Sequence, residues 1–347
     1  MVGNRIKLIR QAHALSLQDL ADELAADAGL TIHRSALSGY ETGRTMPNAA
    51  VLAALSQILG VPREFFFMEE WSDFSLDYFC CPPVAAQRQQ ESDAYVQVRL
   101  ERHHALDSFL GRRSKWRRPE ILELDRGQED RIELLTSSLR EEWHLGIFPV
   151  SSVCGLLESI GWYLLMTPNN LNRITLNDTE ICGYETSCGM PFILYNGSYF
   201  PDELRYKLLK YLGYAYLRGP TPEDTEAMAG HFARALLISH EQVASEVGIR
   251  RERFTQRELL LLKQKYGLPR RLVLRRLYEL GILNQVSYGN VNVYLRQNLF
   301  LQRETIMEHH FSFETPTDYD MKLLQARMEN RIPDEYKALF AQDNLVF

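Results

Sequence analysis

The sequence lacks any apolar run that is long enough to cross a membrane. Its apolar stretches, such as Leu259 to Leu262 and Phe65 to Met68, fall far short of the roughly 20 residues that a transmembrane helix needs. The N-terminus has no apolar segment followed by a small-residue cleavage site, which a secretory signal requires. These two absences predict a cytoplasmic protein with no membrane partner.

Cysteine is scarce, and its spacing is not typical of a metal site. Zinc knuckles place pairs of cysteines two to four residues apart, and no pair in this chain has that spacing. We therefore expect reduced thiols, as is usual in the cytoplasm. The cysteines are Cys80, Cys81, Cys154, Cys182 and Cys188.

An excess of positive charge is also missing. The formal net charge of the 347 residues is −6, so any binding of nucleic acid must come from local groups of basic residues. The apolar fraction of 45% and the charged fraction of 24% are those of a globular protein. At about 100 to 200 residues per domain, the length predicts two or three domains.

The first seventy residues are predicted to form five short helices. Ile6 and Ile9 lie in the first, and Ser16 with Asp19 three residues later forms a capping box at the start of the second. The third helix ends at Gly43, because glycine readily adopts the left-handed conformation that closes a helix. Prolines open the fourth and fifth helices.

These residues closely resemble the Xre-type helix-turn-helix domain of the lambda-repressor and Cro superfamily. The resemblance rests on IRQAHALSLQDLADEL for the first two helices and on HRSALSGYETG, followed by R-T-M-P-N, for the third. It implies that the third helix enters the major groove of a double-stranded DNA operator. Arg34, Ser35 and Gly39 then occupy base-reading positions, with Ser38 nearby. Arg34 is the strongest candidate, because a guanidinium can bind O6 and N7 of guanine together.

The same resemblance implies contacts to the DNA backbone. The candidates are Ser16 and Gln18 at the start of the second helix, and Thr42 and Arg44 after the third. Such contacts fix the position of the protein on DNA without reading its sequence.

The charge of this region predicts that one copy binds DNA weakly. Residues 1–70 contain six Lys and Arg against eight Asp and Glu, a net charge of −2. A homodimer or a second basic surface would supply the missing affinity. Arg10 and Glu41 match a pair that usually forms an internal ion pair in this family, so we expect them to have structural roles.

Residues 71–145 are predicted to connect two domains. Residues 71–95 contain Pro82 and Pro83 and break the helical pattern, so they are interpreted as a linker. Helices are expected from Ala94 to Leu110 and near Gln128 to Trp143. Between them, residues 112–118 carry five positive charges, which indicate either a clamp on DNA phosphates or a solvated loop.

Residues 146–284 are predicted to form a small α+β domain. A helix from Val150 to Ser159 precedes three β-rich runs, GWYLLM, EICGYET and PFILYNG, and several helices follow. The region resembles the ImmA/IrrE family of zinc-peptidase-like proteins. In RYKLLKYLGYAYLRG, which resembles the active-site helix of that family, Lys210, Tyr211 and Tyr214 stand where H-E-x-G-H has its histidines and glutamate.

The replacement residues are unsuited to zinc chemistry. An ammonium group repels Zn²⁺, and tyrosine is a poor base at neutral pH. Glu226 matches the acidic third ligand of the family, but by itself it cannot hold the ion. His231 is interpreted as an ordinary histidine. The sequence therefore predicts no metal, no cofactor and no enzymatic activity, and a degenerate site at Lys210, Tyr211, Tyr214 and Glu226.

A second basic segment follows in the same region. Residues 250–276 contain ten Lys and Arg against two Glu, a net charge of +8. The segment reads as two helices around a short turn at Gly267, so it suits either packing within the domain or a second contact with DNA. Residues 285–347 form a C-terminal extension with an expected helix from Asp318 to Arg331.

The sequence predicts a mainly α-helical protein with a five-helix DNA-binding domain, a small α+β peptidase-like domain and further helices. We interpret it as a non-catalytic transcriptional regulator, a dimer and a repressor, whose second domain senses a small ligand or binds a protein. A zinc metallopeptidase with an unrecognised site and an antitoxin-like protein-binding regulator stay open as alternatives.

Overall fold

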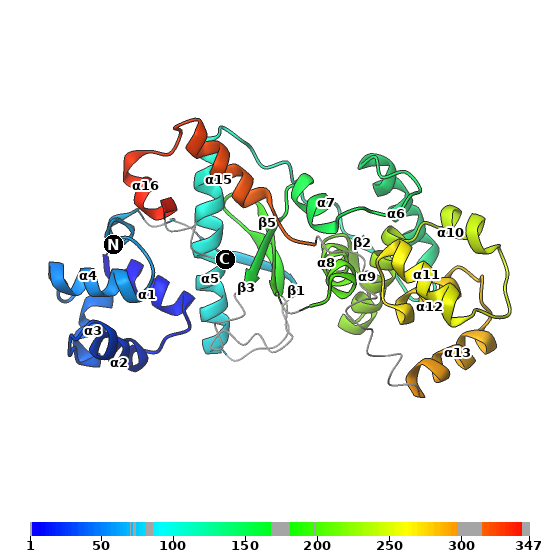
Figure 1. The fold of residues 1–347 in the computed structure, drawn as a ribbon, viewed down its shortest axis with the longest axis horizontal. Coiled ribbons are helices and arrows are strands. Elements are labelled where there is room, and N and C mark those ends of the chain that lie inside the picture. The colour runs from blue at the N-terminus through cyan, green and yellow to red at the C-terminus, as the bar shows by residue number, and fades with distance from the viewer. Residues whose placement is uncertain are drawn as a thin grey trace. The chain divides into compact units, whose positions relative to one another are not determined.

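The computed structural model describes residues 2–69, 71, 74–80, 86–167, 181–197, 199–297 and 314–341. Cys81, Pro82 and Pro83 and part of the C-terminal extension lie outside these residues. Within them the chain is mainly helical with a small mixed sheet, which confirms the predicted fold class (Figure 1). No helix in the described ranges is long and apolar enough to span a bilayer.

The chain divides into two compact units, each built from separate segments. Unit 1 contains Met1–Trp116, Gly161–Gly197 and Thr317–Phe347, and unit 2 contains Arg117–Ile160 and Ser198–Pro316.

Unit 1 begins with the five predicted helices. They are α1 (Val2–Ala12), α2 (Leu17–Asp27), α3 (Arg34–Glu41), α4 (Ala49–Ile58) and η1 (Arg63–Phe67), the last a 3₁₀ helix. The Ser16–Asp19 capping box is present at the start of α2, and Gly43 has a φ of +70° just beyond α3. Ile6, Leu20 and Phe66 are fully buried and form the centre of a shared core.

A long helix, α5 (Ala86–Phe109), packs against α1. It begins at Ala86 rather than at Ala94, so the second half of the predicted linker is helical. The first half also contains regular structure, because β1 (Leu76–Cys80) belongs to a sheet. Two C-terminal helices complete the unit: α15 (Asp318–Met328) contacts α5, and α16 (Asp334–Ala341) contacts η1.

The sheet of unit 1 has the strand order β1-β4-β5-β3, with β3 (Tyr163–Thr167), β4 (Ile181–Glu185) and β5 (Met190–Asn196). The pair β3 and β5 is parallel and the other pairs are antiparallel. Gly183 in β4 lies close to β1, because a Cβ there would stand 2.3 Å from the carbonyl oxygen of Asp77. The three β-rich runs predicted from the sequence are thus strands, joined by one strand that the sequence analysis missed.

Unit 2 contains most of the remaining helices and a two-stranded parallel sheet of β2 (Leu122–Glu123) and β6 (Leu217–Arg218). Its helices follow the predicted order closely, except that α13 was not predicted. They are α6 (Glu129–Glu142), α7 (Val153–Ser159), α8 (Pro201–Tyr216), α9 (Pro222–Leu237), α10 (His240–Val247), α11 (Gln256–Tyr266), α12 (Arg270–Glu279) and α13 (Gln285–Gln297).

Local sequence signals set the boundaries of these helices. Thr255 and Glu258 form a capping box at the start of α11, and Gly267 ends it in the left-handed conformation. Helices α8 and α9 pack closely where Gly213 faces Ala229, because an ideal Cβ on the glycine would stand 3.1 Å from the Cα of Ala229. This close packing accounts for the glycine in the middle of α8.

Candidate nucleic-acid interface

The start of α3 presents the two leading base-reading candidates to solvent. Arg34 and Ser35 are the first two residues of the helix, and both are exposed. His33 is the N-cap residue, but its side chain makes no capping hydrogen bond. The start of α3 therefore keeps backbone N–H groups that could donate hydrogen bonds to an anion.

The other two base-reading candidates lie where α3 ends. The carbonyl oxygen of Ser38 accepts hydrogen bonds from the backbone N–H and the hydroxyl of Thr42, with donor–acceptor distances of 3.0 Å and 2.7 Å. Gly39 packs beneath Thr45, whose Oγ1 would stand 3.0 Å from a Cβ at that position. Both residues are half-buried, so they offer less to a base edge than Arg34 does.

The candidate phosphate contacts differ in the hydrogens that they have left to donate. The hydroxyl of Thr42 donates to Ser38, so it cannot donate to a phosphate oxygen in the same arrangement. Ser16 Oγ accepts from the N–H of Asp19 and keeps its own hydrogen. Gln18 uses one amide hydrogen on Asp22, at 2.8 Å, and keeps the other. Arg44 is exposed.

Three of the predicted residues line one cavity. Ser16, Gln18 and Arg34 lie around a space of about 340 Å³, together with Gln87 and Gln90 of α5. The sequence analysis missed these two glutamines, since they fall in the run interpreted as a linker. Their polarity was the available signal, but only the packing of α5 on α1 brings them to the interface.

Helix α1 contacts α3 through a buried ion pair and through close backbone packing. Arg10 donates two hydrogen bonds to the carboxylate of Glu41, at 2.6 Å and 2.9 Å, and a third to the carbonyl oxygen of Leu15 at 2.6 Å. This confirms the predicted internal ion pair. Close by, Gly3 lies against the end of α3, and a Cβ there would stand 2.3 Å from the carbonyl oxygen of Tyr40.

Comparison with known proteins identifies this part of the chain. Residues 6–66 match a family model described as Helix-turn-helix. They form a helix-turn-helix domain. A curated relative, the SPbeta prophage-derived uncharacterized HTH-type transcriptional regulator YonR of Bacillus subtilis (strain 168), is 36% identical over 77 residues, which are 22% of this chain and 66% of the relative. The chain thus spans slightly less than two thirds of that relative, and no solved structure matches it.

The basic run at residues 112–118 is divided between the two compact units. Arg112 contacts Gln325 at 2.7 Å and Asp318 at 3.8 Å, so part of its charge is used within unit 1. Arg117 already belongs to unit 2. The charges that are adjacent in sequence are therefore divided between two compact units.

Many basic side chains of the segment at residues 250–276 have carboxylate partners within unit 2. At least six of its ten basic side chains have a carboxylate within 4 Å, and most of those carboxylates come from other parts of the chain. The pairs are Arg251–Glu258, Lys263–Asp202, Lys265–Glu246, Arg271–Glu203, Arg275–Glu279 and Arg276–Glu133. These pairs offset much of the net charge of +8 that the segment has in the sequence.

The residues of the predicted degenerate site lie on neighbouring helices. Lys210 Nζ in α8 is 2.5 Å from Glu226 Oε1 in α9. Tyr211 and Tyr214 are buried, and their rings stack with centroids 6.1 Å apart. The described residues hold no group of three or more His, Cys, Asp and Glu side chains that could bind a metal ion.

His231 belongs to a different cluster of charges in unit 2. Its Nε2 lies 2.5 Å from Glu133, and its Nδ1 lies 3.8 Å from Glu279. Burial alone would raise the pKa of Glu133, but hydrogen bonds from Arg276 and His231 outweigh it and lower the pKa to about 2. His231 thus has a structural partner, a contact that its sequence neighbours did not indicate.

Proposed function

We propose that the chain is a sequence-specific transcriptional regulator that binds double-stranded DNA through α3. The helix-turn-helix domain at residues 6–66 is the observation that carries this proposal. The exposed Arg34 at the start of α3, and the attachment of that helix to α1 through Arg10 and Glu41, support it. A rigidly held helix can present its first turn to the major groove.

The proposal is tested on duplexes selected from a random pool by the full chain. Arg34→Ala should weaken binding to the selected duplex by about 1 to 3 kcal/mol and have much less effect on the binding of random duplexes. Arg63→Ala is the matched control, since it removes one exposed positive charge from the same domain outside α3. Failure to select any preferred sequence would refute the proposal.

A homodimer is the second part of the proposal. One helix-turn-helix domain with a net charge of −2 offers few phosphate contacts, so two copies are needed for tight binding at physiological salt. Two half-sites should lie about one helical turn apart, in agreement with a two-fold axis in the protein. Footprinting and the solution mass of the complex measure this, and a single protected half-site with a monomer mass would contradict it.

We further propose that the regulator is a repressor. A protein that occupies its operator in a promoter excludes other proteins from the same DNA. A reporter gene placed behind the selected operator should therefore be expressed less when the protein is present. Increased expression would indicate an activator instead.

The degenerate site supports a proposal that unit 2 has no peptidase activity and instead binds a partner molecule. In the resemblance to zinc-peptidase-like proteins, Lys210 stands at a metal-ligand position, and its ammonium pairs with Glu226, the remaining acidic candidate. A positive charge fixed on the protein would then take the place of the metal ion. Protein purified without chelators should contain no stoichiometric zinc by elemental analysis, and zinc-dependent cleavage of a protein substrate would overturn this part.

A further inference from the structure

Two cysteines lie opposite each other on neighbouring strands of the sheet in unit 1. Cys80 ends β1, and its Cα is paired with that of Cys182 in the antiparallel strand β4. Paired residues of antiparallel strands lie on one face of the sheet with Cα atoms about 4.5 to 5.5 Å apart, and a disulfide requires about 4.4 to 6.8 Å. The backbone thus places these two residues at the separation that a disulfide needs. No function discussed above uses them.

A β-bulge brings Cys80 to this position. The register of the two strands shifts between Tyr78 and Cys80, so Phe79 is the additional residue of β1. A bulge bends its strand and interrupts the hydrogen-bond ladder, and β1 is the outer strand in the order β1-β4-β5-β3. The end of β1 can therefore move by the roughly 1 Å that separates the Cβ spacing of a cross-strand pair from that of a disulfide.

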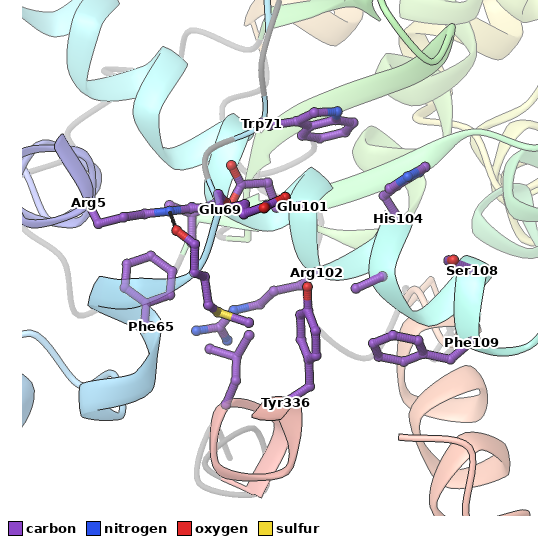
Figure 2. A pocket seen from close by; sticks show the side chains of 14 residues that line it. Arg5, Phe65, Glu69, Trp71, Glu101, Arg102, His104, Ser108, Phe109 and Tyr336 are labelled. Carbon is purple, nitrogen blue, oxygen red and sulfur yellow. Dashed lines mark hydrogen bonds and ion pairs between the residues drawn. The ribbon is translucent and has the colours of Figure 1, made fainter. Parts of the chain in front are cut away.

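Aromatic contacts hold the segment around β1 in its register. Trp71, which precedes the strand, stacks on His104 of α5 with ring centroids 5.2 Å apart (Figure 2). Within the strand, Phe79 stacks on Tyr184 of β4 with ring centroids 5.7 Å apart. Two groups that are held opposite each other react far faster than groups that must meet by diffusion. Cys80 should therefore react with the cysteine across the strand pair rather than with the thiol of another molecule.

The two thiols differ in their access to solvent. Cys80 is half-buried, whereas Cys182 is fully buried. A dissolved oxidant therefore reaches Cys80 first, and the sulfur of Cys182 is shielded from direct oxidation. An accessible thiol beside a second cysteine that can react with its oxidised form is typical of redox-sensitive sites.

We propose that Cys80 and Cys182 are a redox-sensitive pair that a hydroperoxide converts into an intrachain disulfide. Cys80 gives up its proton and its sulfur attacks one oxygen of the hydroperoxide. The O–O bond breaks, the leaving oxygen takes up that proton and departs as an alcohol, and Cys80 becomes a sulfenic acid. The sulfur of Cys182 then attacks the sulfur of Cys80, the S–O bond breaks, and the hydroxide leaves as water with the proton of Cys182. The two thiols lose two electrons and two protons, which reduce the hydroperoxide to an alcohol and water. The proposal does not depend on DNA binding.

The other two described cysteines are not placed to take part. Cys154 lies in unit 2, and burial above all raises its pKa, so it stays a thiol. Cys188 lies beyond Glu185, at the other end of β4 from Cys182. The three residue steps from Cys182 to Glu185 alone span about 10 Å, which is more than the roughly 7 Å that a disulfide allows between Cα atoms. The fifth cysteine, Cys81, lies outside the described residues.

The test uses the reduced full chain, which is treated with hydrogen peroxide after the reductant has been removed. Remaining thiols are then blocked with N-ethylmaleimide, and the protein is digested with trypsin without reduction. Cleavage after Lys and Arg gives residues 64–88, which contain Cys80, and residues 174–205, which contain Cys182. These two peptides should be joined in most of the monomeric chains, and dithiothreitol should separate them. Absence of the joined peptide, or a link found only between two chains, overturns the proposal.

Variants identify the two sulfurs. Each peptide contains a second cysteine, Cys81 or Cys188, so the test is repeated in the double variant Cys81→Ser with Cys188→Ser. The link should persist there, and the further change Cys80→Ser at a half-buried residue should abolish it. Fragment ions of the joined peptide from the unaltered chain should give the same assignment without any variant. A link that is lost in the double variant, or fragment ions that assign it to Cys81 or Cys188, would overturn the proposal.

Discussion

The ion pair between Arg10 and Glu41 should stabilise the helix-turn-helix domain more than surface pairs do. Both residues are 9% exposed, and Arg10 makes all three of its described hydrogen bonds inside the domain. Removing one partner of a buried pair leaves the other charge unneutralised, which costs about 3 to 5 kcal/mol. The loss of stability in Glu41→Gln should lie at the lower end of this range, near 3 kcal/mol, because the amide oxygen still accepts one hydrogen bond.

The second arm of this experiment removes both charges. Arg10→Met leaves the carboxylate of Glu41 without its partner, so it should also destabilise by about 3 kcal/mol. The double variant Arg10→Met with Glu41→Gln buries no unneutralised charge and should lose clearly less than the sum of the two single losses. The difference, about 2 kcal/mol or more, is the coupling energy of the pair.

Hydrogen exchange of the full chain is the appropriate assay. With two compact units the protein need not unfold in one step, so a single global unfolding free energy is a poor measure. Exchange in peptides from α1 and α3 reports the local opening energy directly. Arg44→Gln, an exposed arginine just beyond α3, is the control and should change exchange by less than about 0.5 kcal/mol.

Additive single losses would refute this reasoning, because they would mean that the two side chains do not interact. Losses below about 0.5 kcal/mol in Glu41→Gln would also refute it, since they would place the pair in the energetic class of solvated surface pairs. If the pair holds α3 on α1, Glu41→Gln should in addition weaken binding to the selected duplex although Glu41 itself cannot contact DNA favourably.

Three further outcomes concern unit 2. The pKa of Glu133 is about 2, below its ordinary value of 4.5, so its contribution to stability should be complete above about pH 4.5 and lost as pH falls to about 2. In that window the stability of Glu133→Gln should therefore depend less on pH than the stability of the unchanged protein. An identical dependence on pH would contradict the pairing. Gly213→Ala forces a Cβ against Ala229 and should destabilise α8 by about 1 to 2 kcal/mol, after the helix propensity of alanine is allowed for. Hydrogen exchange in α8 measures this loss. Increased protection would show that the two helices can separate at no cost. Glu314 accepts hydrogen bonds from Arg205 and from two N–H groups of α7, and the side chains of Glu314 and Arg205 are almost fully buried. Glu314→Gln should therefore destabilise the start of α7 by about 3 kcal/mol or more. Unaltered hydrogen exchange in α7 would disprove this.

The candidate interface could be predicted from the sequence because its signals are local. Arg34 and Ser35 stand at the start of α3 since the helix boundary depends on residues only a few positions away, and the same holds for the Ser16–Asp19 capping box. The predicted ion pair of Arg10 with Glu41 came from the family motif, which records a contact between distant residues.

Neighbouring features could not be predicted, because they depend on contacts between segments far apart in sequence. Gln87 and Gln90 reach the interface only through the packing of α5 on α1. The polar run around them has no hydrophobic signal of its own, so the sequence predicts a linker there. In the same way, β1 was missed because five residues become a strand only when β4 supplies their hydrogen-bonding partners.

Local sequence signals are sufficient to place the ends of most helices and to predict that the first of them form a helix-turn-helix domain. Capping boxes, left-handed glycines and apolar periodicity act within a few residues, so they need no knowledge of the rest of the chain. The pairing of charges, in contrast, depends on the folded chain. Arg276 and Glu133 are 143 positions apart and yet form a pair with Arg276 fully buried, so a charge of the strongly basic segment is neutralised by a residue from a distant helix. The physical reason is that a buried charge must find an opposite charge in space, and folding, not sequence order, determines which one is near.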